Sequence, residues 1–434
     1  MRDGARVAAA IEILSDIEAR KRPAADAAKD WMLSHRFAGS KDRAEIGDLV
    51  FGALRWKQSS AWRLGEDTPR SWVFGAVAWG FARGPDWIAN ACAADPHAPP
   101  PPSEAEQSAL AQATLDGAPD WVRGDFPEWL DASMARIFGE ARAEEGAALA
   151  APAPLDLRVN TLKSTRDDVI AALAESPRLK EPPAPTSHAP DGVRIPWAQG
   201  RTFPWAAEQS FLKGWFEVQD EGSQIAALLA GASPREQVLD LCAGAGGKTL
   251  AMAAAMQNKG QIYAYDEDRL RLKPIFDRVH RSGLRNIQIL RGGDKQALGA
   301  MGAKFDRVLV DAPCTGSGTW RRRPDAKWKL KPEAVLNRLK EQREVLKDAA
   351  RLVKPGGRLI YVTCSILPEE NGGQVLAFLR DNGAFSQVPY ADVWRDVLPG
   401  EPPVSADGST GGLMLSSAKH GTDGFYISVL ARAA

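Results

Sequence analysis

Cysteine is scarce in this sequence, and neither sign of charge is in excess. Only four of the 434 residues are cysteine, and no two of them form a C-x-x-C pair: they are Cys92, Cys242, Cys314 and Cys364. The missing pair argues against a structural zinc site. So small a number is more typical of a reducing cytosol than of a disulfide-linked secreted protein. Lys+Arg and Asp+Glu each total 55, so any surface that attracts a polyanion must be local.

Long apolar runs are also missing. No stretch approaches the roughly 18 apolar residues that a membrane span needs. Glu12, Asp16 and Glu18 interrupt the first apolar stretch, which is therefore unlike a signal peptide. Hydrophobic residues make up 44% of the chain and charged residues 25%, which is ordinary for a soluble protein. We expect a cytoplasmic protein with no membrane partner and no metal; the sequence indicates nothing about its oligomeric state.

The chain is too long for one hydrophobic core, and its pattern changes along its length. Residues 1–95 are predicted to form a helical domain, because apolar residues recur there at helical spacing. Residues 96–124 begin with a proline-rich run and are predicted to be a linker. Residues 125–214 mix short helix and strand signals, which predicts a small α/β module. Residues 215–434 form the last and most regular domain.

Short apolar segments alternate with helical ones in this last domain. The predicted strands are residues 237–241, 261–265, 286–290, 305–310 and 357–362, with 424–431 as an antiparallel edge. The spacing of Leu336, Leu339 and Leu346 predicts a long helix that ends at Pro355-Gly356-Gly357. The alternation predicts an α/β, Rossmann-like fold with a parallel sheet and right-handed crossovers. Ligands of such sheets bind at the carboxyl ends of the strands.

A glycine-rich loop follows the first of these strands, and it has two interpretations. It consists of Cys242, Ala243, Gly244, Ala245, Gly246, Gly247 and Lys248, followed by Thr249. Glycines let the backbone approach a ligand, and the N-terminus of the next helix favours electronegative groups. Gly247-Lys248-Thr249 matches the end of a phosphate loop, which would indicate a P-loop ATPase. That motif, however, needs glycine where Cys242 stands.

Two acids favour the other interpretation, a loop that binds S-adenosyl-L-methionine. Asp266 ends the second strand, about 20 residues after the glycines, where a carboxylate can accept from both ribose hydroxyls. Asp294 follows the third strand and is placed to accept from the adenine amine. Alternatively, both acids are helix caps or turn residues. Their joint placement favours the cofactor.

Two cysteines stand just past the ends of predicted strands. Cys314 lies in Asp311-Ala312-Pro313-Cys314, and Cys364 lies in Thr363-Cys364-Ser365. A single buried cysteine is usually a small core residue. Two thiols at the ligand-binding edge of a sheet, beside a nucleotide-type loop, instead predict covalent chemistry on a bound substrate.

These motifs, in this order, resemble those of the RNA cytosine-5 methyltransferases of the Rsm/Sun type. The match includes residues 219–224, 242–249, 311–318 with 321–325, 363–365 with 369–371, and 423–426. Residues 158–161 resemble the family's RNA-recognition module, and residues 41–43 and 49–55 resemble, more loosely, the NusB-like helical domain of the bacterial rRNA member. One departure is Gly244-Ala245, where the family usually has Ala-Pro. Two small residues with a flexible backbone should still allow this loop to bind the cofactor.

The resemblance implies a role for each site residue. Cys364 would be the nucleophile that adds to carbon 6 of cytosine, and Cys314 would assist loss of the carbon-5 proton and release of the enzyme. The DNA enzymes use the Pro-Cys thiol instead, so spacing alone leaves this order open. Asp311 would hydrogen-bond the cytosine edge and touch the cofactor. Lys248 would reach the substrate or stabilise the loop, unless it is a solvated lysine at a helix start.

RNA is the implied partner, with small-subunit rRNA favoured by the helical N-terminal part. A tRNA substrate is the alternative within the class, and an RNA-binding factor without catalysis is an alternative outside it. Residues 321–331 hold six basic side chains against one acid, with Trp320 and Trp328 beside or among them. This pattern predicts a strip that binds the RNA backbone and stacks bases; the alternative is an ordinary solvated face.

Overall fold

The computed structural model describes residues 1–434 and divides into two compact units. The first, called the helical unit below, comprises Met1–Ala151 and Trp320–Leu330. The second, called the sheet unit, comprises Pro152–Thr319 and Lys331–Ala434. The chain therefore leaves the helical unit after residue 151 and returns to it for one short segment.

The helical unit is built from helices alone. They are α1 (Asp3–Arg20), α2 (Ala24–Ser34), α3 (Ser40–Arg55), α4 (Lys57–Leu64), α5 (Pro69–Gly75), the π-helix η1 (Ala76–Gly80), α6 (Gly84–Ala93), α7 (Glu104–Gln112), α8 (Asp120–Arg123), η2 (Glu128–Leu130), α9 (Asp131–Phe138), η3 (Gly139–Ala141), α10 (Arg142–Ala150) and α19 (Pro324–Lys329). Leu14 of α1, Ile46 of α3 and Phe74 of α5 are fully buried in one shared core. The predicted helical character is thus confirmed, whereas the likeness to NusB stays a prediction.

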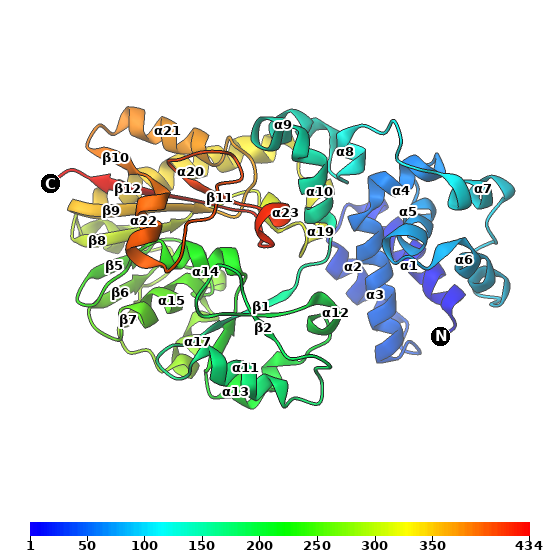
Figure 1. The fold of residues 1–434 in the computed structure, drawn as a ribbon, viewed down its shortest axis with the longest axis horizontal. Helices are drawn as coiled ribbons and strands as arrows, with labels where there is room; N and C mark the ends of the chain where they lie inside the picture. The colour runs from blue at the N-terminus through cyan, green and yellow to red at the C-terminus, as the bar shows by residue number, and fades with distance from the viewer. The chain divides into compact units, whose positions relative to one another are not determined.

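Helices continue past the predicted end of the helical domain. α7 and α8 lie in residues 96–124, where we expected a linker, and α9 and α10 lie in the first part of the expected α/β module (Figure 1). A local signal explains the start of α7. The Ser103 hydroxyl accepts from the Glu106 amide at 3.2 Å, and the Glu106 carboxylate accepts from the Ser103 amide at 2.8 Å. This capping box starts a helix directly after the prolines.

The sheet unit contains a small antiparallel sheet with strand order β2-β3-β1-β4. Its elements are β1 (Leu155–Val159), α11 (Arg166–Ala174), β2 (Ala184–Pro185), β3 (Gly192–Ile195), α12 (Trp197–Gly200), η4 (Trp205–Ala207), α13 (Gln209–Leu212) and β4 (Phe216–Val218). Leu157, Val193 and Phe216 form a core of their own with Leu173 of α11. This mixed helix and strand content agrees with the expected α/β module.

The large sheet has the order β10-β12-β9-β8-β5-β6-β7, and β11 pairs with β12. The strands are β5 (Gln237–Asp240), β6 (Gln261–Ala264), β7 (Ile287–Ile289), β8 (Phe305–Asp311), β9 (Val353–Thr363), β10 (Phe385–Val388), β11 (Leu413–Leu415) and β12 (Phe425–Arg432). Strands β5 to β9 pair in parallel, and β12 joins β9 antiparallel. The predicted Rossmann-like fold is confirmed, including its antiparallel edge.

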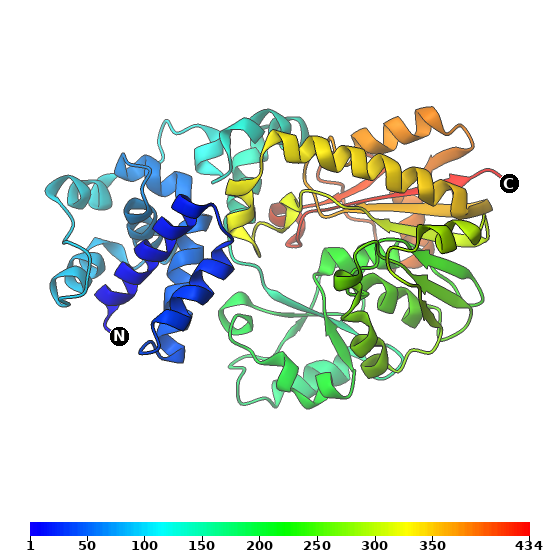
Figure 2. The same ribbon diagram turned by 180° about the vertical axis from the view of Figure 1, so that it is seen from behind.

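Helices cover both faces of the large sheet. The remaining helices of the sheet unit are α14 (Glu221–Leu228), α15 (Gly247–Ala255), α16 (Arg269–Leu272), α17 (Ile275–Ser282), α18 (Lys295–Ala300), η5 (Ser317–Thr319), α20 (Pro332–Leu352), α21 (Gly372–Asp381), α22 (Tyr390–Val397) and α23 (Ser417–His420). Figure 1 shows α14, α15 and α22 in front of the sheet, and Figure 2 shows α20 crossing its other face. No helix in the chain combines the length and the hydropathy of a membrane span.

The long helix α20 differs in one respect from the sequence prediction. Leu346 and Leu352 are buried against the sheet, as is Val335, but Leu336 is 59% exposed. The buried stripe thus includes the residue before Leu336 rather than Leu336 itself. Because α20 has leucines on more than one face, apolar spacing alone does not identify the face that is buried.

Candidate active site

The glycine loop turns sharply between β5 and α15. Gly244 and Gly246 adopt φ values of +50° and +81°, in the left-handed region that favours glycine. A Cβ atom on Gly246 would lie 2.4 Å from Cγ1 of Ile275, so a larger residue would force the loop away from α17. Gly244 has the positive φ at the place where the sequence departs from the family's usual pair, which explains why glycine suits that position.

Asp266 lies beside this loop, as the sequence predicted. One oxygen of its carboxylate accepts from the Gly244 amide at 2.8 Å, and the other accepts from the Asp268 amide at 2.9 Å. Only 3% of the residue is exposed. Asp294, in contrast, caps α18 by accepting from the Ala297 amide at 3.0 Å. Its capping role matches the alternative interpretation, and a contact with adenine stays a prediction.

Arg158 also contacts the loop. The residue is 8% exposed, and its guanidinium donates to the side-chain oxygen of Gln219 and to the carbonyl of Gly247. Burial lowers the pKa of Arg158 to about 10. The sequence grouped Arg158 with an RNA-recognition module, but its guanidinium is enclosed within the sheet unit and ties the small sheet to the glycine loop.

Lys248 is buried and forms an ion pair with the partly exposed Asp311. Lys248 Nζ lies 2.7 Å from Oδ2 of Asp311 and 5.2 Å from the ring centroid of Phe425, and only 7% of the lysine is exposed. Burial alone would lower the pKa of this lysine, but the charges of Asp311 and Cys364 outweigh it and the pKa is raised. The alternative of a solvated lysine at the helix start is therefore wrong.

The two cysteines predicted from strand ends lie side by side. Cys314 Sγ and Cys364 Sγ are 3.4 Å apart, within hydrogen-bonding distance and longer than a disulfide. The hydrogen bond to Cys364 and burial raise the pKa of the Cys314 thiol well above its usual value. Cys364 is partly exposed. Cys242 is also free, and burial raises the pKa of its thiol.

Backbone hydrogen bonds hold the two cysteine loops together. The Ala312 amide donates to the Val362 carbonyl at 2.8 Å, and the Gly318 amide donates to the Cys364 carbonyl at 2.9 Å. A Cβ atom on Gly318 would lie 2.1 Å from the carbonyl oxygen of Gly424, so the loop that carries Cys314 is packed against the start of β12 too closely for a side chain. The sulfurs are thus fixed by the sheet and not by flexible loops.

The predicted RNA-binding strip is only partly exposed: Arg322, Arg323 and Lys331 are exposed, whereas other residues of the strip are buried. Trp320, Arg321 and Lys327 are each no more than 5% exposed. Lys327 Nζ donates to the carbonyls of Arg55 at 2.8 Å and Asp125 at 2.6 Å. The Trp328 indole donates to the Leu54 carbonyl at 2.6 Å. The strip prediction is therefore wrong for these residues, because packing and hydrogen bonds occupy their side chains.

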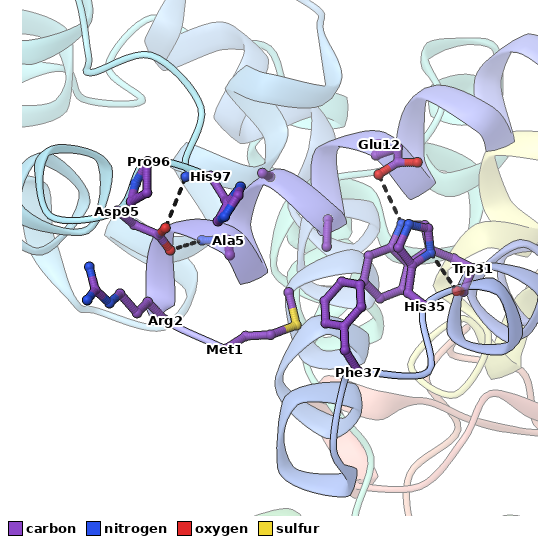
Figure 3. A pocket seen from close by; sticks show the side chains of 12 residues that line it. Met1, Arg2, Ala5, Glu12, Trp31, His35, Phe37, Asp95, Pro96 and His97 are labelled. Atoms are coloured by element: carbon purple, nitrogen blue, oxygen red, sulfur yellow. Dashed lines mark hydrogen bonds between the residues drawn. The ribbon is translucent and has the colours of Figure 1, made fainter.

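The helical unit has a separate cavity of about 720 Å³ near its first helix. Trp31, His35 and Phe37 form one wall, where the Trp31 and His35 rings stack with centroids 4.0 Å apart. Figure 3 shows that both carboxylates of the cavity are bonded to its own walls: Glu12 accepts from Trp31, and Asp95 accepts from the amides of Ala5 and His97. The cavity has neither a thiol nor a glycine loop, so the sheet unit holds the candidate active site.

Comparisons with known proteins agree with this site. A family model described as "16S rRNA methyltransferase RsmB/F" matches residues 227–431, and a second, "Methyltr_RsmF/B-like, ferredoxin-like domain", matches residues 126–199. The chain is 35% identical over 315 residues to a probable ribosomal RNA small subunit methyltransferase B of Synechocystis, covering 71% of this chain and 67% of that protein. It is 37% identical over 266 residues to the corresponding enzyme of Sodalis glossinidius, covering 60% of this chain and 58% of the relative. The chain thus spans between half and two thirds of these curated relatives.

Solved structures show the same fold. The crystal structure of PH0851 superposes with a TM-score of 0.72 at 26% identity, covering 99% of this chain and 98% of that one. NSun6 from Pyrococcus horikoshii, solved with SFG, gives a TM-score of 0.61 at 21% identity and covers 71% of this chain and 99% of that chain. At that identity, the second likeness supports the fold alone.

Proposed function

This chain belongs to the RsmB/F family of 16S rRNA methyltransferases, and we propose that it methylates carbon 5 of a cytosine in small-subunit rRNA. One observation carries the chemical part of the proposal. The sulfurs of Cys314 and Cys364 lie 3.4 Å apart at the carboxyl ends of adjacent parallel strands, the edge where the glycine loop also lies. A P-loop ATPase and a silent RNA-binding factor would have no use for two adjoining thiols there.

S-adenosyl-L-methionine is the cofactor of this family, and the residues present fit it. The loop from Cys242 to Lys248 brings backbone at positive φ beside the buried carboxylate of Asp266. Ribose hydroxyls are donors of the kind that such a carboxylate accepts. When bound, the cofactor supplies an electrophilic methyl group. Asp294 and Asp311 complete the proposed set of binding residues.

The thiol of Cys364 is the proposed nucleophile. Carbon 5 of cytosine is a poor nucleophile, but a thiolate that adds to carbon 6 turns the ring into an enamine-like species. Lys248 lies close enough to Cys364 for their charges to interact, and a cation there favours the thiolate. Lys248 also holds the Asp311 carboxylate in place, so that Asp311 can accept a hydrogen bond from the cytosine edge.

Cys314 then completes the reaction in this proposal. The carbon-5 proton has to leave as the bond between carbon 6 and the Cys364 sulfur breaks, which restores the aromatic ring and the free thiolate. Cys314 lies next to that sulfur and is placed to assist the proton's departure. The target base must leave its stack to reach this edge, so an unpaired or loop nucleotide is the easier substrate. A cytoplasmic location is part of the same proposal.

Methyl transfer from labelled S-adenosyl-L-methionine tests the proposal. We expect label in 16S rRNA but not in tRNA, with bisulfite sequencing mapping it to carbon 5 of a cytosine. Cys364→Ala should abolish both methylation and the covalent protein–RNA adduct, whereas Cys314→Ala should leave an adduct that persists on a denaturing gel. Label confined to tRNA would move the substrate to the alternative within the class. Label on another base would refute the chemistry.

A further inference from the structure

Glu370 is a buried carboxylate that joins the two cysteine loops. It is 0% exposed and precedes α21. Its Oε1 accepts from the Thr315 amide at 2.9 Å, and its Oε2 accepts from the hydroxyls of Thr315 at 2.5 Å and of Ser365. Thr315 directly follows Cys314, and Ser365 directly follows Cys364. One side chain therefore fixes the residues next to both sulfurs.

The hydrogen bonds around Glu370 suit an ionised carboxylate. A fourth donor, the side-chain amide of Gln342 in α20, reaches Oε1 at 3.0 Å. All four groups can donate, and a charged carboxylate is acceptor-only, with room for about four such bonds. Neutral donors can hold a buried negative charge in place, but they do not cancel its field as a cation would.

The surroundings of the two sulfurs differ: Glu370 makes two hydrogen bonds to Thr315, next to Cys314, and one to Ser365, next to Cys364. The titratable groups that face Cys314 are Glu370, Cys364 and, from β9, Tyr361, and the first two both raise the pKa of Cys314. The ammonium of Lys248, which pairs with Asp311, interacts electrostatically with Cys364. A proton shared between two sulfurs moves away from the cation and toward the anion.

We propose that Glu370 is the positioning residue that makes the two thiols unequal, by keeping the shared proton on Cys314 and leaving the negative charge to Cys364. This inference rests on the proposed function, because it assigns the order of the two cysteines in that reaction. Sequence spacing alone leaves this order open, since the thiol of the Pro-Cys motif serves as nucleophile in related DNA enzymes.

The protons balance as follows. The reactive pair holds one proton, on Cys314, and the Cys364 thiolate forms the bond to carbon 6. While Cys364 is bonded to carbon, Cys314 loses its proton to solvent. The Cys314 thiolate then takes the carbon-5 proton as the bond between carbon and the Cys364 sulfur breaks, and the starting pair is restored. One proton per cycle reaches solvent, in exchange for the methyl group gained by the base.

Glu370→Gln is the matched variant, because an amide keeps the shape and removes the charge. The hydroxyls of Thr315 and Ser365 can rotate to accept from its new N–H groups, so the loops can stay bonded. In single-turnover reactions, the rate at which the RNA adduct is released should rise with pH. The variant should reach the same rate as the wild type at a pH lower by about one unit. At a fixed pH within the range where the release rate rises, the variant should release the RNA about tenfold faster than the wild type. The KM for RNA should not change.

Glu341→Gln is the control, since Glu341 is an exposed neighbour of Gln342 that pairs with Arg338. It should leave the pH profile of release unchanged. A folded Glu370→Gln protein whose profile matches that of the wild type would overturn the inference. So would equal shifts in both variants.

A measurement on the wild-type chain covers the case in which Glu370→Gln does not fold. Alkylation by iodoacetamide, followed by mass spectrometry of each cysteine peptide, reports when each thiolate forms without any RNA. Cys364 should react at a lower pH than Cys314, and the reverse order would overturn the inference. Because this readout needs no methyl transfer, it separates a failure here from a failure of the proposed function.

Discussion

Two lysines in this protein are buried almost equally, and their surroundings give them opposite properties. In the sheet unit, Lys248 contacts the carboxylate of Asp311, and its pKa is raised. In the helical unit, Lys327 is 1% exposed and donates to two backbone carbonyls; burial lowers its pKa, although the charge of Asp125 acts in the opposite direction. A carboxylate in direct contact keeps the first lysine charged, whereas the second contacts carbonyl oxygens and the more distant charge of Asp125 does not offset its burial. Lys248 is therefore suited to a role in catalysis, and Lys327 is suited to a role in stability.

The largest effect expected from this comparison is on activity. Lys248→Met removes the cation beside Cys364 and leaves Asp311 without its partner. We expect methylation to fall by about 100-fold or more, the usual loss when one preorganised electrostatic group is removed from an active site. Lys248→Arg keeps the charge and should recover part of the rate. Initial rates of methyl transfer from labelled cofactor measure the activity of both variants. Near-normal activity of Lys248→Met would show that Lys248, like Lys327, is not needed for catalysis.

A third buried base, His420, extends the comparison to a group that stays neutral. Its Nδ1 accepts from the Ser416 amide at 3.0 Å, so its Nε2–H is the donor to the Val404 carbonyl at 3.1 Å. Burial lowers its pKa from 6.5 to about 4. At His420, the unfolded chain therefore binds more protons than the folded chain between these pH values, and the contribution of this residue to stability falls as pH drops from 6.5 to 4. The loss is roughly 3 kcal/mol.

Denaturant unfolding at pH 7 and at pH 4.5 tests this loss. His420→Gln should flatten the dependence of stability on pH over this range. His97→Gln, which changes an exposed histidine, should keep the wild-type slope. A slope that survives in His420→Gln would assign the acid sensitivity to other groups.

The next effect is on stability in the helical unit. Lys327→Met keeps the apolar stem but leaves the carbonyls of Arg55 and Asp125 without this donor. Losing one partner of a buried hydrogen bond costs about 1–3 kcal/mol, so we expect a loss of about 2 kcal/mol in the free energy of unfolding. Activity per folded molecule should stay close to that of the wild type. A loss of RNA affinity without loss of stability would restore the strip that the sequence predicted.

Lys329→Met gives the smallest effect and serves as the matched control. Lys329 stands on the same short helix, but its side chain is 32% exposed and pairs with Asp325 four residues earlier. Ion pairs between residues four apart on a helix contribute roughly 0.3–0.5 kcal/mol. Its unfolding free energy should therefore stay within about 0.5 kcal/mol of the wild type. A cost equal to that of Lys327→Met would show that total charge, not burial, sets the stability of this segment.

The sequence predicts the sites whose positions follow from the topology of the sheet. Cys314 and Cys364 are far apart in the chain, but each follows a parallel strand, and the carboxyl ends of such strands meet at one edge. The same logic brings Asp266 to the glycine loop. These predictions succeed because strand direction alone decides them.

Residues whose contacts come from segments distant in the sequence cannot be predicted in this way. Lys327 has the composition of a basic strip, and its bonds go to carbonyls more than 200 residues earlier in the chain. Glu370 stands in a recognised motif, but its importance depends on Thr315 in another loop. Leu336 fits the helical spacing and is nevertheless exposed. Local patterns do not encode which surface will be covered by a remote segment.

The return of residues 320–330 to the helical unit has a consequence for synthesis. The carbonyls of Leu54, Arg55 and Asp125 meet their donors only when Lys327 and Trp328 have been translated. Residues 152–319 are made first, which takes on the order of ten seconds or more at about 5–20 residues per second. Through that interval the nascent N-terminal bundle remains incomplete on the ribosome, so it cannot be finished as an independent module before most of the polypeptide exists.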